Sequence, residues 1–176
     1  MDLPLYLLLG LLILALIIGG PLLRSRSKRR AAQDGEHTGN RYAAARLAET
    51  LDVLGTPLVI HAPEALAREI LASASATVTA REECTIREDG GYGIRFAEPD
   101  DTIVRLVADP EGTRMQVETF REYLGFPQTA QPWTDLRSRV ASIADARGVT
   151  VGDGATIGYR RGPLLDDRNA RWERDA

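Results

Sequence analysis

Hydrophobic and polar positions change their period several times along the 176 residues of this chain. Residues 3–23 form an unbroken apolar run without a charged side chain. Residues 41–76 have the spacing of amphipathic helices, interrupted by one short apolar run. Residues 77–120 alternate with a period of two, and residues 133–148 return to a helical period. The pattern predicts an apolar helix first, and then a domain that combines helices with antiparallel strands.

The apolar run at residues 3–23 is predicted to be a transmembrane helix, because roughly 20 apolar residues suffice to cross a bilayer core. Five basic residues follow the run: Arg24, Arg26, Lys28, Arg29 and Arg30. A cleaved signal peptide would carry its basic residues before the apolar stretch instead. Under the positive-inside rule this membrane-flanking basic cluster stays in the cytoplasm. We therefore expect a single-pass protein of the plasma (inner) membrane, with the N-terminus outside, the C-terminal domain cytoplasmic, and the lipid bilayer as the partner of residues 3–23.

Composition divides the rest of the chain into three parts. Residues 24–40 hold the basic flank and a polar linker that contains glycine. Residues 41–160 carry the periodic patterns and are expected to form one α+β domain in the cytoplasm. The pattern leaves open whether residues 149–160 form a hairpin. Residues 161–176 are rich in charge and are expected to be a flexible tail.

Turn sequences separate the alternating runs of residues 77–120. The segment Asp89-Gly90-Gly91 is typical of a tight hairpin turn with positive φ. Two later segments, 98–101 and 109–112, have proline at the second position of a turn. Successive hairpins predict an antiparallel meander of about four strands.

The last helix has an apolar stripe whose members recur every three or four residues: Trp133, Leu136, Val140 and Ile143. This stripe is expected to pack on the meander, because no other apolar surface remains to cover it. The predicted fold class is α+β, with an N-terminal transmembrane helix plus one small domain in which an antiparallel β-meander packs on a long C-terminal helix.

Charge and cysteine content narrow the functional classes. The chain has a formal net charge of −3. From Ala31 onward it holds 17 basic and 24 acidic side chains, which argues against a nucleic-acid surface. The single cysteine, Cys84, cannot build an internal disulfide framework. It is interpreted either as a small buried hydrophobe or as a reactive thiol.

No constellation of catalytic, cofactor-binding or metal-binding residues is recognisable. The two histidines, His37 and His61, have no nucleophile beside them in a known motif. Two histidines and one cysteine at wide separation do not match the ligand spacing of a metal site. No catalytic residue, cofactor or metal is therefore assigned. Three aromatic residues, Phe120, Tyr123 and Trp133, are candidates for lining a ligand pocket, with ordinary core packing as the alternative.

A strand, an Ala-Pro step and a helix open the domain, with the sequence Val59-Ile60-His61-Ala62-Pro63-Glu64-Ala65-Leu66 running into Ile70-Leu71. This opening resembles that of the polyketide cyclase and START-like helix-grip superfamily, and the resemblance covers residues 58–147. The resemblance implies an apolar cavity between the sheet and the last helix. It carries no catalytic residues, because that superfamily has no common set.

Three functions are compatible with these expectations. The first is a membrane-anchored cytoplasmic binding or interaction domain with a protein partner and no recognisable catalytic site. The second is a helix-grip carrier or enzyme for a lipid or another small apolar ligand. The third is an accessory subunit of a membrane complex. A large apolar cavity would favour the second function, whereas a filled core with an exposed apolar patch would favour the first or the third.

Overall fold

The computed structural model describes residues 41–76 and 84–175 of the chain. These residues belong to two compact units, Met1–Arg46 and Leu47–Ala176. Residues 41–46 are what is described of the first unit, and they are helical. The strands and helices named below belong to the second unit.

A helix through residues 47–55 leads into the first strand, β1 (Leu58–Ile60). Its last residue is Gly55, and the carbonyl group of Ile157 lies so close that a Cβ at this position would collide with it. Pro57 follows, and proline disfavours a helical conformation in the residue before it. The Gly-Thr-Pro sequence therefore separates helix from strand within two residues.

Helix α2 (Glu64–Ala76) follows β1 closely. It begins directly after Pro63, as expected from the tolerance of proline in the first turn of a helix. Glu64 places a negative charge near the positive end of the helix dipole. The helix buries a face of small and branched side chains: Ala67, Ile70, Leu71 and Ala74.

Three turns connect the next four strands: β2 (Cys84–Ile86), β3 (Tyr92–Ile94), β4 (Thr102–Asp109) and β5 (Gly112–Tyr123). The β2–β3 turn closes with a hydrogen bond of 3.1 Å from the N–H of Gly90 to the carbonyl oxygen of Arg87. Gly90 has a φ of 79°, which a residue with a Cβ rarely adopts. All three turns lie at the segments for which the sequence predicted turns.

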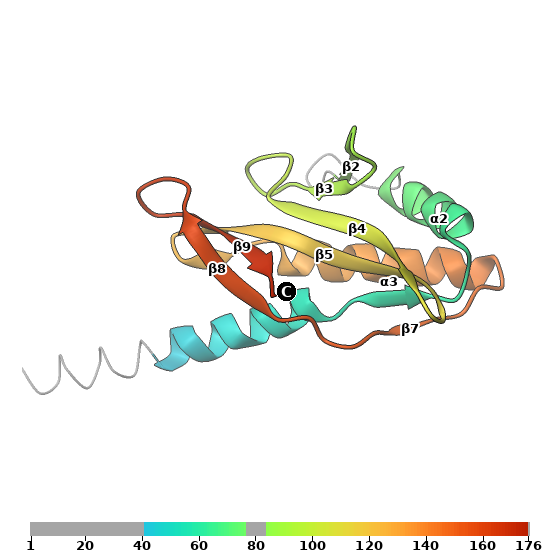
Figure 1. Cartoon of the computed structure of the whole chain (residues 1–176), viewed down its shortest axis with the longest axis horizontal. Helices are drawn as coiled ribbons and strands as arrows, with labels where there is room; N and C mark the ends of the chain where they lie inside the picture. Colours follow the sequence, from blue (N-terminus) through green and yellow to red (C-terminus); the bar gives the residue numbers. More distant parts are fainter. Residues whose placement is uncertain (1–40, 77–83, 176) are drawn as a thin grey trace, which may run out of the picture. The chain divides into compact units, whose positions relative to one another are not determined.

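Strand β5 is the longest strand and organises the sheet (Figure 1). It is followed by β6 (Phe126–Pro127), α3 (Ala130–Ala146), β7 (Val151–Asp153), β8 (Tyr159–Leu164) and β9 (Ala170–Arg174). The strand order is β2-β3-β4-β5-β1-β7, and the β8–β9 hairpin joins the sheet because β9 also pairs with β5. One edge of β5 pairs with β4. On the other edge, β1 pairs with β5 around Met115, and β9 pairs with it around Phe120.

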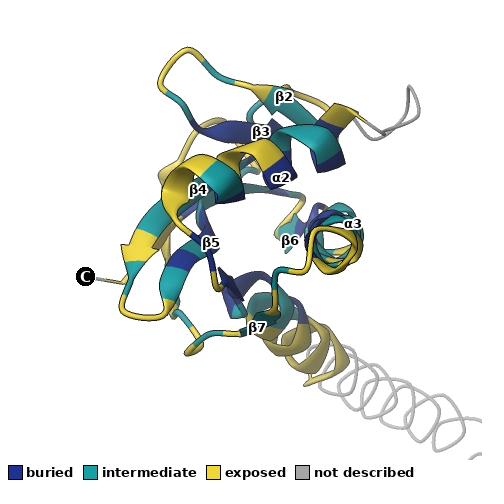
Figure 2. Ribbon diagram, turned by 90° about the vertical axis from the view of Figure 1, so that its right-hand side faces the viewer, coloured by how far each residue is buried: buried dark blue, intermediate teal, exposed yellow. Residues whose placement is uncertain are grey.

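Helices α2 and α3 pack against each other and against one face of the sheet (Figure 2). Their buried side chains join those of β3, β4 and β5 in a single core cluster. The largest fully buried apolar members are Trp133, Tyr92, Phe120, Leu54, Ile60, Ile70, Leu71, Met115 and Leu136. The opposite face of the sheet carries half-buried polar side chains, among them Arg105 and Thr119.

The fold is α+β with an antiparallel sheet, but the predicted fold class requires two corrections. No helix in residues 41–76 and 84–175 is long and apolar enough to cross a membrane, so the fold that the structure shows contains no transmembrane helix. The predicted span at residues 3–23, the basic flank and the linker at residues 24–40 lie outside the described residues. The predicted meander of about four strands is present as β2-β3-β4-β5, but it is not the whole sheet. The described part contains a nine-stranded sheet in which β1 lies between β5 and β7.

The C-terminal residues differ from the predicted flexible tail. They form most of β8 and all of β9, in which the buried Ala170 and Trp172 alternate with the charged Arg171 and Glu173. The Trp172 ring stacks on Phe120 with 5.8 Å between the ring centroids. Residues 149–160 do not form a hairpin of their own, since β7 pairs with β1 and β8 pairs with β9.

Val140 offers a test of the packing of α3. Its side chain is fully buried, whereas Ser142 on the same helix is exposed. We expect Val140→Asp to lower the free energy of unfolding by several kcal/mol, because it buries a carboxylate without a partner. Ser142→Asp should change that free energy by less than about 0.5 kcal/mol. Urea unfolding of the full-length chain, followed by circular dichroism, measures both variants. Equal values would contradict the burial of this helix face.

Candidate functional site

Three loops meet at one end of the sheet, where β3 leads into β4, β5 into β6 and β8 into β9 (Figure 1). These loops and the last residue of β8 carry four large apolar side chains that are at least half exposed: Phe96 at 54%, Leu124 at 75%, Leu164 at 56% and Leu165 at 50%. We call these four residues the apolar end. In the described part of the second unit, Ile86 is the one other exposed large hydrophobic residue. The apolar end is therefore a local concentration and not scattered surface hydrophobicity.

The β3–β4 loop is held by the buried carboxylate of Asp101. Its Oδ2 accepts the backbone N–H groups of Phe96, Ala97 and Glu98 at 3.1, 2.6 and 2.8 Å. Its Oδ1 accepts the hydroxyl of Tyr123 at 2.6 Å. Burial, together with this hydrogen bond, raises the pKa of Tyr123 to about 12, so the phenol remains a donor. The Phe96 ring consequently lies beside the Tyr123 ring, with 5.4 Å between centroids.

The β5–β6 turn holds Leu124 in a left-handed conformation. Its φ is 54°, and that of the following Gly125 is 81°. Positive φ at both central positions is the geometry of a type I′ hairpin turn, in which Asn-Gly is strongly preferred. A leucine in this conformation costs roughly 1–2 kcal/mol relative to a right-handed one. Because the side chain is also the most exposed of the four, packing does not offset that cost.

The β8–β9 loop is closed by Asp166 and Asn169. Oδ1 of Asp166 accepts the N–H groups of Arg168 and Asn169 at 3.0 and 2.9 Å. Its Oδ2 accepts Nη2 of Arg121 at 2.9 Å. Hydrogen bonds from the Arg168 backbone, from Asn169 and from Arg121 lower the pKa of Asp166 to about 2. The Asn169 Oδ1 in turn accepts the N–H of Leu124 at 2.9 Å, which ties this loop to the β5–β6 turn.

Beneath these loops, Glu122 fastens the C-terminal hairpin to β5. Its side chain is 1% exposed, and it accepts hydrogen bonds from the guanidinium of Arg161 and from Nε1 of Trp172, the latter at 2.8 Å. Burial alone would raise the pKa of Glu122. The hydrogen bonds from Arg161 and Trp172 outweigh burial and hold the pKa below its usual range.

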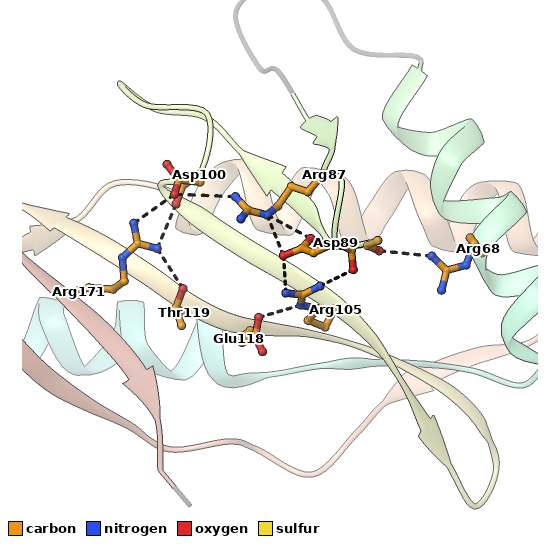
Figure 3. Close-up of polar contacts among 10 residues, drawn as sticks. Arg68, Arg87, Asp89, Asp100, Arg105, Glu118, Thr119 and Arg171 are labelled. Carbon is orange, nitrogen blue, oxygen red and sulfur yellow. Dashed lines mark hydrogen bonds and ion pairs between the residues drawn. The ribbon is translucent and has the colours of Figure 1, made fainter.

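An ion-pair network lies on the open face of the sheet and runs from Asp100 and Arg171, near the same end, to Asp89 in the β2–β3 turn (Figure 3). Arg105 donates to Glu118 at 2.8 Å and to Asp89 at 2.7 Å. Arg171 lies 3.5 Å from the Asp100 carboxylate. Hydrogen bonds from the Gly91 backbone and from Arg105 lower the pKa of Asp89. Since each of these guanidinium groups already has a carboxylate partner, the network connects loops and strands and does not offer an open anion site.

The structure separates the three aromatic residues that the sequence suggested for a ligand pocket. Phe120 and Trp133 are fully buried in the core. Nε1 of Trp133 donates to the carbonyl oxygen of Val53 at 3.1 Å. Tyr123 is half-buried beside Phe96. The ligand pocket itself remains a prediction, and the five basic residues Arg24, Arg26, Lys28, Arg29 and Arg30 lie outside the described residues.

Cys84 and His61, the other two residues considered for chemistry, both contact neighbouring residues. Cys84 receives a hydrogen bond of 3.4 Å from Ser75, and burial raises the pKa of its thiol, which disfavours the thiolate. Nδ1 of His61 lies 3.2 Å from the carbonyl oxygen of Glu111. Within residues 41–76 and 84–175, no group of three or more His, Cys, Asp or Glu side chains could hold a metal ion.

Sequence reasoning missed the apolar end, although two signals were present. Leu124 and Gly125 lie between two aromatic residues, and a two-residue segment that ends in glycine is typical of a hairpin turn. Leu164 and Leu165 interrupt a charged segment. Comparison with protein-family models, curated proteins and solved structures finds no match to this chain, so the helix-grip resemblance stays a prediction.

The depressed pKa of Glu122 predicts a pH dependence. A carboxylate with a lowered folded-state pKa stabilises the fold above its unfolded pKa of about 4.3, and this stabilisation is lost as the pH falls through the folded-state value. We expect Glu122→Gln to lower the free energy of unfolding at pH 7 by about 1–3 kcal/mol. The variant should also lose less stability than the wild type below pH of about 4.3.

Urea unfolding of the full-length chain between neutral and acidic pH measures this difference. Glu88→Gln is the control, because Glu88 is an exposed residue of the β2–β3 turn. That variant should keep the pH dependence of the wild type. Parallel curves for the wild type and Glu122→Gln would show that the buried carboxylate does not anchor the C-terminal hairpin.

Proposed function

We propose that this domain is a protein-interaction module, and that its partner offers an apolar pocket to the apolar end formed by Phe96, Leu124, Leu164 and Leu165. The observation that carries the proposal is Leu124. It combines an unfavourable backbone conformation with 75% exposure. Strain of this kind persists where the surrounding structure imposes it, and it clusters at functional sites.

The rigidity of the three loops supports this function. Asp101, Asp166 and Asn169 fix the loop backbones through side-chain hydrogen bonds, while the neighbouring apolar side chains point outward. A surface that is ordered before binding loses less conformational entropy in the complex. The apolar end thus has the properties of a preorganised binding surface.

The packing of α3 favours a surface site over an internal one. Trp133, Leu136 and Val140 are fully buried and belong to the same core cluster as Met115 and Val117 of the sheet. A carrier of apolar ligands needs an enclosed space of several hundred Å³ at such a position. Here the side chains of α3 and of the sheet pack against each other in one cluster. This packing is expected of a domain that binds its partners at the surface.

The charges around the apolar end favour a protein over a lipid surface. Besides the buried Asp101, the β3–β4 and β8–β9 loops carry four acidic residues, Glu98, Asp100, Asp166 and Asp167, and two basic ones, Arg95 and Arg168. The arginines beneath them are paired, Arg121 with Asp166 and Arg171 with Asp100. Anionic headgroups attract unpaired basic clusters, which this end does not present.

Replacement of Leu124 by asparagine separates binding from stability. Asparagine tolerates the left-handed conformation, so Leu124→Asn should raise the free energy of unfolding by about 1 kcal/mol. The same change removes the most exposed apolar side chain and should weaken partner binding. We expect a benzophenone-bearing residue at position 164 of the full-length chain to form a discrete cross-linked product in its native cells, and Leu124→Asn to reduce that product several-fold.

The same photoreactive residue at position 142 is the control, because Ser142 is exposed on α3 and has no place in the apolar end. Unfolding by urea verifies that Leu124→Asn is not destabilised. The proposal fails if positions 164 and 142 give the same products, or if Leu124→Asn leaves the yield at position 164 unchanged.

A further inference from the structure

A second surface lies between α3 and the outermost strand of the sheet. A groove of about 290 Å³ runs between the two elements. Its apolar walls come from Leu58, Ala141 and Val151, and its polar groups include Arg137, Ser138 and Asp153. The groove shares no residue with the apolar end.

Strand β7 ends the strand order, and no other strand in the described part of the chain pairs with its outer edge. The N–H of Gly154 donates to Pro57 at 3.1 Å, and the N–H of His61 donates to Thr150 at 3.0 Å. Residues of an antiparallel strand direct their N–H and C=O groups alternately toward and away from the partner strand. The N–H and C=O groups of Val151 and Asp153 therefore face away from β1, on the free edge.

We propose that this groove binds an extended peptide segment of a partner protein, which pairs with β7 as an added strand and lies along α3. A free strand edge beside a helix is the arrangement used in recognition by β-strand addition. Backbone hydrogen bonds from Val151 and Asp153 supply affinity, and the apolar walls take alternate side chains of the peptide. This site is independent of the interaction proposed for the apolar end.

Arg137 and Asp153 form an ion pair within the groove. The Arg137 guanidinium lies over the Trp133 ring at 5.9 Å and is fixed there by the cation–π contact. Its Nη2 lies 2.5 Å from Oδ1 of Asp153, whose side chain is 71% exposed. Its Nε is buried and has no hydrogen-bond partner among the described residues. Because the Asp153 carboxylate already pairs with this guanidinium, the groove offers no open site for a charged side chain, and its apolar walls favour uncharged side chains of the peptide.

The size of β7 favours a peptide over a second copy of the chain. The strand has three residues, and its free edge presents the backbone groups of two of them. Symmetric pairing of two such edges buries far less than the roughly 800 Å² per partner of a stable interface. A peptide that pairs with the edge and also fills the groove gains contacts with both elements.

A phage-displayed library of random twelve-residue peptides, selected on the full-length chain, supplies the probe. The affinity of the synthesised peptides is then measured by fluorescence anisotropy. Ser138→Trp fills the groove from an exposed helix position, and Ser142→Trp places the same side chain one turn further along, outside the groove. We expect Ser138→Trp to raise Kd by about tenfold or more and Ser142→Trp by less than about twofold.

Two further measurements test the binding mode. Methylation of alternate peptide nitrogens should abolish binding in one register and spare it in the other, because strand addition uses every second N–H. Replacing the apolar peptide residue that faces the groove by aspartate should weaken binding to the wild type about tenfold or more. Selected peptides that bind Ser138→Trp as tightly as the wild type, or that are indifferent to N-methylation, would overturn the proposal, as would a selection without enriched peptides.

Discussion

The geometry of β5 is the constraint on which the other elements depend. Its first half pairs with β1 and its second half with β9, while β4 follows the opposite edge. Two segments that are more than a hundred residues apart in the sequence must therefore meet the same edge of one strand. The register shift beside Ile103 and Val104 places an extra residue, Glu118, in β5, and such a bulge bends the strand and increases its twist. This bend lets the second half of β5 direct Phe120 toward Trp172.

Two buried carboxylates hold the loops and the C-terminal hairpin at the end of β5 in place. Asp101 satisfies three backbone N–H groups and one phenol, and Glu122 receives an arginine and an indole. Burying either group without such partners would cost several kcal/mol. Both therefore require the loop or hairpin that they hold to adopt one conformation. The hydrophobic core determines where β4 and β5 lie, and these polar contacts determine where the loops beyond the core end.

Local features of the fold could be predicted from the sequence, whereas long-range pairings could not. Proline and glycine act on their immediate neighbours, so the turns around Gly90 and the start of α2 after Pro63 were predictable. The place of β9 depends on Trp172 reaching Phe120, and no local period reports that contact. In the same way, the type of an aromatic residue does not reveal its burial, and Trp133 proved to be a core residue. The apolar end was missed because three separate segments build it.

The places where the chain departs from local rules are also the places where function is expected. In the core, local propensity, packing and hydrogen bonding all favour the same structure. Proteins depart from such agreement mainly at functional sites. Here the departures are a left-handed leucine at position 124 and a free edge at β7. Strand β7 is joined through β1 to the first half of β5, near Met115, and Leu124 follows the end of that strand. At about 3.3 Å per residue these positions are separated by roughly 30 Å along β5. Most of the length of β5 therefore separates the two surfaces.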